Sequence, residues 1–225
     1  TYSGDIGCYT LGNALPLDMV DSCVCMGAGF TVPQGRYWAE PDGAHLGFVG
    51  DSTFFASALT GVTNAVYNQA RVTLIVLDNS ITAMTGQQPH PGTGLRMSYD
   101  AGPHDGAHDI SIPQVLEALG VTSVAVVNPL DLPRAVKAVT AAVEEPGVSA
   151  VVFRAPCITV GSPGLAPIVV ADACTGCRVC IESIGCPALS LDEEVDTIAI
   201  NTSLCYGCGL CTQVCPFSAL EASHG

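Results

Sequence analysis

The stretch that decides the fold of the C-terminal region is CYGCGLCTQVCP, residues 205–216. Its first three cysteines stand three positions apart, and a Cys-Pro pair follows after three more residues. A related run, CTGCRVCIESIGCP, occupies residues 174–187, with five residues instead of three before its Cys-Pro pair. The internal repeat predicts one small α+β module built from two similar halves.

The spacing of the second copy is that of bacterial ferredoxins. In those proteins each [4Fe-4S] cluster takes three cysteines from one run and its fourth from the other run. We therefore expect two clusters. The ligands would be Cys174, Cys177, Cys180 and Cys215 for the first, and Cys205, Cys208, Cys211 and Cys186 for the second. The unequal spacing predicts unequal cluster environments. Zinc, which also binds paired Cys-x2-Cys motifs, is the alternative.

The composition narrows the class of protein further. The 225 residues carry 21 acidic and 7 basic side chains, a formal net charge of −14 that disfavours nucleic acid and anionic membrane surfaces. Twelve cysteines without a secretory signal favour metal or redox chemistry in a reducing compartment. No uninterrupted apolar run reaches the ~18 residues of a membrane-spanning helix. We expect a soluble cytoplasmic protein and, since the chain starts at Thr1, a piece of something longer.

Upstream of the cysteine repeat, compact apolar runs alternate with helical patterns. The runs expected as strands are residues 45–50, 72–78, 122–127 and 149–154, and the expected helices are 54–68, 112–119 and 130–145. Continuous apolarity indicates strands buried on both faces, as in a parallel sheet. The sequence therefore predicts an α/β domain whose mostly parallel sheet is flanked by helices.

Gly and Pro mark the predicted domain boundary. We expect the α/β domain at residues 1–157, a linker at 158–167 and the cluster domain at 168–225. Within the first domain, residues 87–111 carry Gly, Pro, His and Asp without periodicity. A loop of that length inside a compact domain is usually functional.

Polar residues follow two of the predicted strands. Gly50-Asp51-Ser52 ends one strand and opens a helix, and Asp78-Asn79 ends the next strand. The carboxyl ends of parallel strands are where α/β sheets bind ligands. A carboxylate and an amide oxygen there can share one Mg²⁺, and the tight Gly50 turn can present N–H groups to a diphosphate. Two ordinary strand-to-helix turns are the alternative.

These residues resemble the thiamine diphosphate motif, in which Gly-Asp-Gly precedes a later Asn-Asn or Asp-Asn pair, although Ser52 replaces the third glycine. Longer segments resemble the C-terminal half of the large subunit of indolepyruvate:ferredoxin oxidoreductases. They are GDIGCYTLG (4–12), CMGA (25–28), GDSTFF (50–55), NAVYN (64–68), LDN (77–79), TAMTG (82–86) and QPHPGTG (88–94). With the cysteine repeat, the resemblance covers nearly the whole chain and implies a thiamine diphosphate-binding fold followed by a ferredoxin domain.

The resemblance also implies roles for individual residues. Asp51 and Asn79 would bind Mg²⁺ together with the backbone carbonyl of Ile81. The diphosphate would be lined by Gly50, Ser52, Thr53, Met84 and Thr85, and the cofactor rings would be approached by Cys25, Met26 and Gly27. His90, in the loop that would cover the cofactor, would contact the substrate or its proton. The alternative for His90 is a plain loop histidine.

The reaction implied by the resemblance is the oxidative decarboxylation of an arylpyruvate to acyl-coenzyme A and CO₂. Single electrons would pass through the clusters to an external ferredoxin. A small β subunit and a pyrimidine-binding domain or chain, which completes the thiamine site, would be partners. The alternatives are the same chemistry on pyruvate or phenylglyoxylate, and a non-catalytic electron-transfer subunit.

A third [4Fe-4S] cluster is also implied. Cys8 and Cys157 match two of the four ligand positions of a cluster close to the thiamine in related 2-oxoacid oxidoreductases, and the other two ligands would lie outside this chain. Plain buried cysteines are the alternative, because free cysteine is a common core residue.

Overall fold

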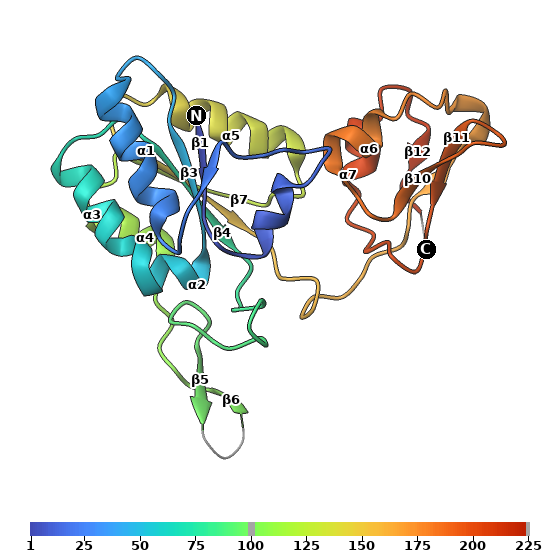
Figure 1. Cartoon of the computed structure of the whole chain (residues 1–225). Helices are drawn as coiled ribbons and strands as arrows, with labels where there is room; N and C mark the ends of the chain where they lie inside the picture. The colour runs from blue at the N-terminus through green and yellow to red at the C-terminus, as the bar shows by residue number, and fades with distance from the viewer. Residues whose placement is uncertain (99–101, 224–225) are drawn as a thin grey trace. The chain divides into compact units, whose positions relative to one another are not determined.

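A computed structural model describes residues 1–98 and 102–223 (Figure 1). Two compact units divide the chain. The first comprises Thr1–Leu11 and Val20–Thr159, and the second comprises Gly12–Met19 and Val160–Gly225. The loop at Gly12–Met19 is thus grouped with the C-terminal unit, a feature that the composition of the chain does not signal.

A six-stranded sheet forms the middle of the first unit, and every pair of neighbouring strands in it is parallel. Its order is β2-β1-β3-β4-β8-β7, with β1 at Tyr2–Gly4, β2 at Ser22–Cys23, β3 at Leu46–Gly50, β4 at Thr73–Asp78, β7 at Ser123–Val127 and β8 at Ser149–Arg154. The four predicted strands and the parallel sheet are confirmed. The first two strands were not predicted, because they are too short to form an apolar run.

Helices connect these strands. They are α1 (Ala28–Ala39), α2 (Asp51–Thr53), α3 (Leu59–Tyr67), α4 (Ile112–Ala118) and α5 (Leu132–Glu144), with a 3-10 helix η1 at Cys8–Asn13 and a π-helical segment η2 at Phe54–Ala58. The predicted helix at 54–68 begins earlier, at Asp51, and contains the π segment. Such segments are rare and often occur at functional sites. Helix α1 was not predicted, since two glycines and Pro33 interrupt its pattern.

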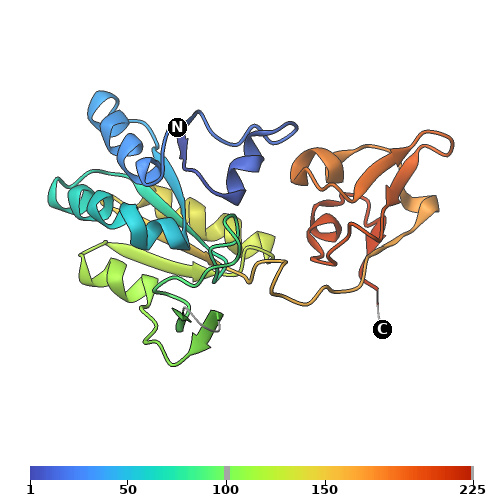
Figure 2. The same cartoon turned by 60° about the horizontal axis from the view of Figure 1, so that its bottom comes forward.

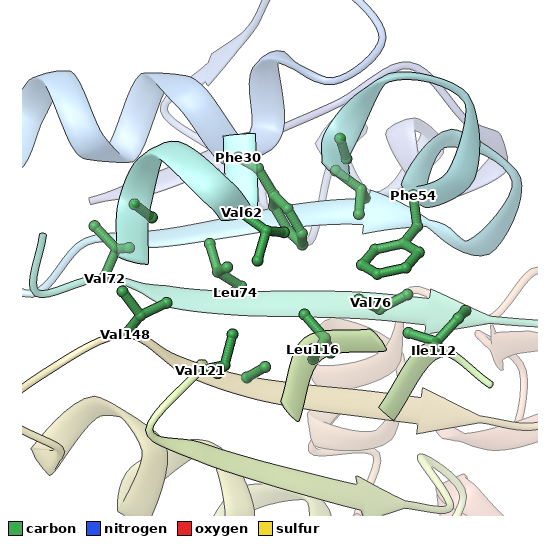
Figure 3. Close-up of a cluster of buried hydrophobic side chains, with 14 of the residues drawn as sticks. Phe30, Phe54, Val62, Val72, Leu74, Val76, Ile112, Leu116, Val121 and Val148 are labelled. Carbon is green, nitrogen blue, oxygen red and sulfur yellow. The ribbon is translucent and has the colours of Figure 1, made fainter. Parts of the chain in front are cut away.

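The main core lies on one face of the sheet. Side chains alternate between the faces of a strand, so Leu74 and Val76 of β4 point to the side covered by α1, α3 and α4 (Figure 3). Thr73 points to the other face, where its hydroxyl donates to the carbonyl of Ala142 in α5 at 3.3 Å. Figure 2 shows α1, α3 and α4, in blue, cyan and yellow-green, along one side of the sheet. The unit is therefore an α/β sandwich with helices on both faces.

The long segment between β4 and α4 has structure of its own. It contains the antiparallel strands β5 (Leu95–Ser98) and β6 (Gly102–Asp105), which lie away from the main sheet in Figure 1. Thr82 N–H donates to the carbonyl of Gln88 at 2.9 Å and so closes a tight turn before this hairpin.

The second unit is the small α+β module that the repeat predicts. It consists of β9 (Ile168–Val169), η3 (Ala171–Ala173), α6 (Val179–Ile184), β10 (Leu189–Asp192), β11 (Thr197–Ile200), α7 (Leu210–Val214) and β12 (Leu220–Glu221). Strands β9 and β12 pair antiparallel, as do β10 and β11. In the described part of both units, no helix is long and apolar enough to cross a membrane.

Candidate functional site

The carboxyl ends of β3 and β4 border a cavity of about 210 Å³. Its lining consists of Ile6, Gly7, Cys8, Tyr9, Met26, Gly50, Asp51, Ser52, Thr53, Leu77, Asn79, Ile81, Thr82, Ala83, Met84 and Thr85. Most residues predicted to hold the cofactor or its metal are thus brought together. Of the others, Cys25 is exposed beside Met26, and Gly27 is buried at the start of α1.

Asp51 supplies a carboxylate to the lining of this cavity. It is the first residue of α2, and its side chain is buried. Its Oδ1 accepts from the N–H of Ser52 at 2.8 Å, and its Oδ2 accepts from the N–H of Ser80 at 2.8 Å. Two backbone donors from different strand ends therefore fix a carboxylate, which is the kind of ligand that Mg²⁺ prefers.

The Asp78-Asn79 pair at the end of β4 divides its two side chains between different partners. Asp78 Oδ2 accepts from Nε of Arg154 at 2.7 Å, and its Oδ1 accepts from the N–H of Ser80 at 3.2 Å. Asn79 lines the cavity, and its Oδ1 accepts from the N–H of Ile81 at 3.1 Å. The amide oxygen of Asn79, and not the carboxylate of Asp78, therefore shares the cavity with Asp51.

The segment after β4 forms one wall of the cavity. Ser80 has a φ of 62°, in the left-handed region, which turns the chain sharply after the strand. The hydroxyl of Thr82 then donates to Oγ of Ser52 at 2.9 Å, and the hydroxyl of Thr85 donates to Oε1 of Gln88 at 2.6 Å. Hydroxyls from both strand ends are thus held beside the predicted diphosphate position.

Tyr9 is a cavity residue to which the sequence analysis gave no role. Its hydroxyl accepts from the N–H of Gly50 at 3.1 Å. Burial raises the pKa of Tyr9 well above its usual value, and the nearby charge of Asp5 adds to this. The signal was present in the GDIGCYTLG run at 4–12, where only Cys8 was singled out.

Asp5 is a fully buried carboxylate, also missed from the sequence. Both of its oxygens accept from the N–H of Gly27, at 2.9 and 3.0 Å. Burial raises the pKa of Asp5, while the bond from Gly27 opposes the shift. Gly27, predicted to approach the cofactor rings, therefore directs its N–H to Asp5, which ties the start of α1 to the end of β1.

His90 lies in the segment after β4, and its ring is buried. Nε2 is 3.0 Å from Oδ2 of Asp51, and the ring stacks on Phe55 with centroids 5.8 Å apart. The ring is not oriented to form a hydrogen bond across that distance, so Nε2 has no hydrogen-bond partner among the described residues. The predicted substrate contact of His90 stays a prediction. The structure places its ring against a predicted metal ligand.

Cys8 and Cys157 both lie by this edge of the sheet. Cys8 is exposed and lines the cavity. Cys157 follows β8, and its N–H donates to the carbonyl of Asn79 at 3.1 Å. Its sulfur lies 3.2 Å from the hydroxyl of Thr159.

The first predicted set of cluster ligands is assembled in the second unit. Cys174, Cys177, Cys180 and Cys215 line one small cavity. Burial raises the pKa of the Cys180 thiol, with further effects from Cys215 and Cys177. In the described residues, no three Cys, His or acidic side chains are arranged around a single metal ion. The four cysteines instead surround a cavity.

The second predicted set is also close together. Burial raises the pKa of Cys211 to about 11, and the neighbouring Cys208, Cys186 and Cys205 contribute to the rise. Backbone N–H groups donate to sulfur in both sets: Ile198 to Cys174 at 3.4 Å, Gly207 to Cys205 at 3.4 Å and Ala219 to Cys215 at 3.2 Å. Such donors stabilise thiolate ligands of iron–sulfur clusters.

Comparison with known proteins agrees with this geometry. The model of the C-terminal TPP-binding domain of thiamine pyrophosphate enzymes matches residues 5–153. The chain belongs to the thiamine pyrophosphate enzymes. The thiamine-binding domain is followed by an iron–sulfur region, since the model of the LdpA Fe-S cluster-binding domain matches residues 182–224.

Relatives of this thiamine pyrophosphate enzyme include indolepyruvate oxidoreductase subunit IorA of Thermococcus kodakarensis, 41% identical over 98% of this chain and 36% of its own length. The same subunit of Archaeoglobus fulgidus is 39% identical over 96% of this chain and 34% of its own length. These matches confirm the resemblance to the indolepyruvate oxidoreductase subunit. The chain spans about a third of the length of these relatives.

The fold has a solved counterpart. The 2-oxoglutarate:ferredoxin oxidoreductase of Magnetococcus marinus superposes with a TM-score of 0.62 at 21% identity, over 71% of this chain and 55% of that one. At this identity the likeness concerns the fold.

Proposed function

We propose that this chain is the catalytic half of a 2-oxoacid:ferredoxin oxidoreductase that acts on an arylpyruvate of the indolepyruvate type. The observation that carries the proposal is the union, in one chain, of a thiamine pyrophosphate domain with Asp51 and Asn79 at one cavity and a doubled four-cysteine module. The names of the relatives supply the substrate class.

The donor set at the cavity fits a magnesium diphosphate. Asp51 and Asn79 offer a carboxylate and an amide oxygen, and the backbone carbonyl of Ile81 would be a third ligand. Ser52, Thr53, Met84 and Thr85 would line the diphosphate, with Gly50 beside it at the start of the helix. Bound thiamine diphosphate supplies the carbon nucleophile and the electron sink for decarboxylation of a 2-oxoacid.

The cysteine module would carry the electrons away one at a time. Its two sets of four cysteines each suit one [4Fe-4S] cluster, with the fourth ligand crossing between the repeats. Cys180 and Cys211 are buried, and burial is one of the factors that would set the potentials of the clusters. Cys8 and Cys157 would hold half of a third cluster near the thiamine.

The site is proposed to be completed by other parts of the protein. A pyrimidine-binding domain or chain would cover the exposed side of the cavity, where Met26 and Met84 are half exposed. A small β subunit, an external ferredoxin and coenzyme A would be the remaining partners. The acidic charge and the free cysteines favour a cytoplasmic location.

The cofactor content tests the proposal. The assembled protein, purified gently and without oxygen, is expected to hold thiamine diphosphate, Mg²⁺ and iron–sulfur clusters together. Clusters without thiamine, in a preparation that also fails to bind added thiamine diphosphate, would support an electron-transfer subunit instead.

The substrate is tested by comparing indolepyruvate, phenylpyruvate and pyruvate as donors to a low-potential acceptor in the presence of coenzyme A. The proposal predicts higher kcat/KM for the two aryl substrates. A preference for pyruvate would reject the arylpyruvate assignment and leave the reaction type intact.

A further inference from the structure

The ring of His90 is held from two sides in the first unit. Phe55, which the π-helical segment after α2 presents, stacks on it at an interplanar angle of 29°. Gly92 lies close to both rings, because a Cβ at this position would lie 3.0 Å from Cε2 of Phe55 and 3.2 Å from Cε1 of His90. The position of the ring is therefore set by packing.

Hydrogen bonding assigns the proton on this ring. The N–H of Gly92 donates to Nδ1 of His90 at 3.2 Å, so Nδ1 acts as the acceptor. In a neutral imidazole the other nitrogen then carries the hydrogen. Nε2–H is consequently the group that lies 3.0 Å from Oδ2 of Asp51.

This donor is buried and without a hydrogen-bond partner in the described chain. A buried donor without a partner destabilises the fold, so a small rotation that brings it into line with Oδ2 is favourable. Oδ2 already accepts from Ser80, and Oδ1 accepts from Ser52. A third donor would leave the carboxylate of Asp51 with one free direction, toward the cavity.

We infer that His90 is a positioning residue for Asp51, and that its Nε2–H aligns with Oδ2 when the carboxylate binds the divalent cation. The inference rests on the proposed role of Asp51 as a metal ligand. Hydrogen-bonding partners of metal ligands typically change metal affinity about 10–100-fold when they are removed. His90 would thereby set the affinity of the site for its cation through Asp51.

The contact between His90 and Asp51 would also connect the long segment at residues 87–111 to the cation site. Thr93 donates to the carbonyl of His90 through both its N–H and its hydroxyl, at 3.0 and 2.9 Å. The N–H of Ile110 donates to the carbonyl of Pro91 at 2.9 Å, which closes the base of the segment. The turn that carries His90 is therefore rigid enough to act as a support.

Two substitutions separate hydrogen bonding from packing. His90→Phe keeps an aromatic ring against Phe55 but removes the donor, whereas His90→Gln keeps a donor near the position of Nε2. His108→Leu is the control, since His108 belongs to the same segment and is exposed. Each variant is prepared as the assembled protein, and its thermal unfolding without metal shows that it is folded.

The measurement is the Kd of Mg²⁺ by calorimetry at saturating thiamine diphosphate, with the EPR spectrum of bound Mn²⁺ as a second readout. We expect the Kd of His90→Phe to rise about 10–100-fold, and that of His90→Gln to return most of the way to the unsubstituted value. The Mn²⁺ spectrum of His90→Phe should broaden, because the carboxylate is less fixed. His108→Leu should match the unsubstituted protein.

Different outcomes would overturn the proposed function and the inference about His90. Failure of the unsubstituted protein to bind Mg²⁺ and thiamine diphosphate would overturn the proposed function. Normal binding by the unsubstituted protein, with a Kd for His90→Phe within about twofold of it, would overturn the inference alone. If His90→Phe does not fold, a Kd for His90→Gln that is raised as much as Asp51→Asn raises it would also reject the inference.

Discussion

At the scale of single residues, the carboxylates that follow β3 and end β4 have different hydrogen-bond partners. Asp51 is held by the backbone N–H groups of Ser52 and Ser80, whereas Asp78 pairs with the guanidinium of Arg154. Backbone donors leave the negative charge of Asp51 uncompensated. A cation at the cavity would therefore be drawn to Asp51, while Asp78 serves the structure of the strand end.

Asp51→Asn and Asp78→Asn should consequently affect different properties: the first the binding of the cofactor, the second the stability of the fold. Asp51→Asn is expected to weaken Mg²⁺-dependent binding of thiamine diphosphate at least about tenfold. Asp78→Asn is expected to keep binding but to lower the free energy of unfolding by about 1 kcal/mol, because the partly exposed Arg154 loses its partner. Calorimetry and urea unfolding, followed by the fluorescence of the single Trp38, measure both. Equal losses of binding would contradict this division of roles.

Asp5 predicts a pH dependence of stability. Burial raises its pKa in the folded chain, so the folded chain binds the proton more tightly than the unfolded one. Its contribution is thus fully present below the usual pKa and is lost as the pH rises through the raised value. Asp5→Asn keeps an acceptor for Gly27 and should gain stability relative to the native chain as the pH rises above about 4, the usual pKa of an aspartate. A pH-independent difference in urea unfolding would refute the assignment.

Sequence could predict which residues would lie together where one motif carried them, while their roles as ligands stay predictions. Asp51 and Asn79 stand at strand ends that the apolar runs made visible, and the structure puts both at one cavity. Tyr9 and Asp5 were missed because their roles depend on Gly50 and Gly27, and no local pattern pairs residues so far apart in the chain.

At the scale of elements, the cysteine repeat is preserved in the backbone as well as in the spacing. Gly176 and Gly207 occupy equivalent positions with φ of 64° and 73°. Two positions later, Arg178 and Gly209 have φ of 61° and 73°. Both loops therefore turn through the left-handed region twice before their helices begin.

The repeat makes a paired prediction for two glycines. Gly209→Arg copies the residue of the other half into open space, so it should cost about 1–2 kcal/mol and leave both clusters in place. Gly207→Ala would put its Cβ 2.3 Å from the carbonyl carbon of Gly164 and should destroy the second loop. Iron and sulfide in the assembled protein after anaerobic reconstitution are expected to be unchanged in the first variant and lower by about one cluster of the proposed three in the second. Equal iron contents would contradict the account.

The elements that were not predicted from the sequence are those whose stability comes from pairing with, or packing against, neighbouring elements. Strands β1 and β2 are three and two residues long; β1 pairs with the edge that β3 offers, and β2 pairs in turn with β1. Helix α1 has glycines at close contacts, where Gly29 approaches the carbonyl of Phe48. Packing of this kind overrides helix propensity and leaves no periodic signal.

At the scale of the whole molecule, the thiamine domain and the cysteine module follow one another in a single chain. The matched families divide the sequence in the same way, at residues 5–153 and 182–224. The proposed third cluster is the feature that would connect the two functions.

Cys8→Ser and Cys157→Ser test that cluster in the assembled protein. Each should lower the iron content by about a third and leave the clusters of the second unit intact, because those draw only on the repeat. Cys23→Ser is the matched control, since its thiol donates to the carbonyl of Asp5. An unchanged iron content in both variants would show that Cys8 and Cys157 hold no cluster.

The central claim is that electrons released at the thiamine site reach the clusters of the same chain. EPR spectroscopy of the anaerobic assembled protein, mixed with indolepyruvate and coenzyme A, tests it most directly. The account predicts signals of reduced [4Fe-4S] clusters in the unsubstituted protein and none in Asp51→Asn, whose clusters dithionite still reduces. Clusters that stay oxidised in the thiamine-loaded unsubstituted protein, or that indolepyruvate reduces equally in Asp51→Asn, would contradict it.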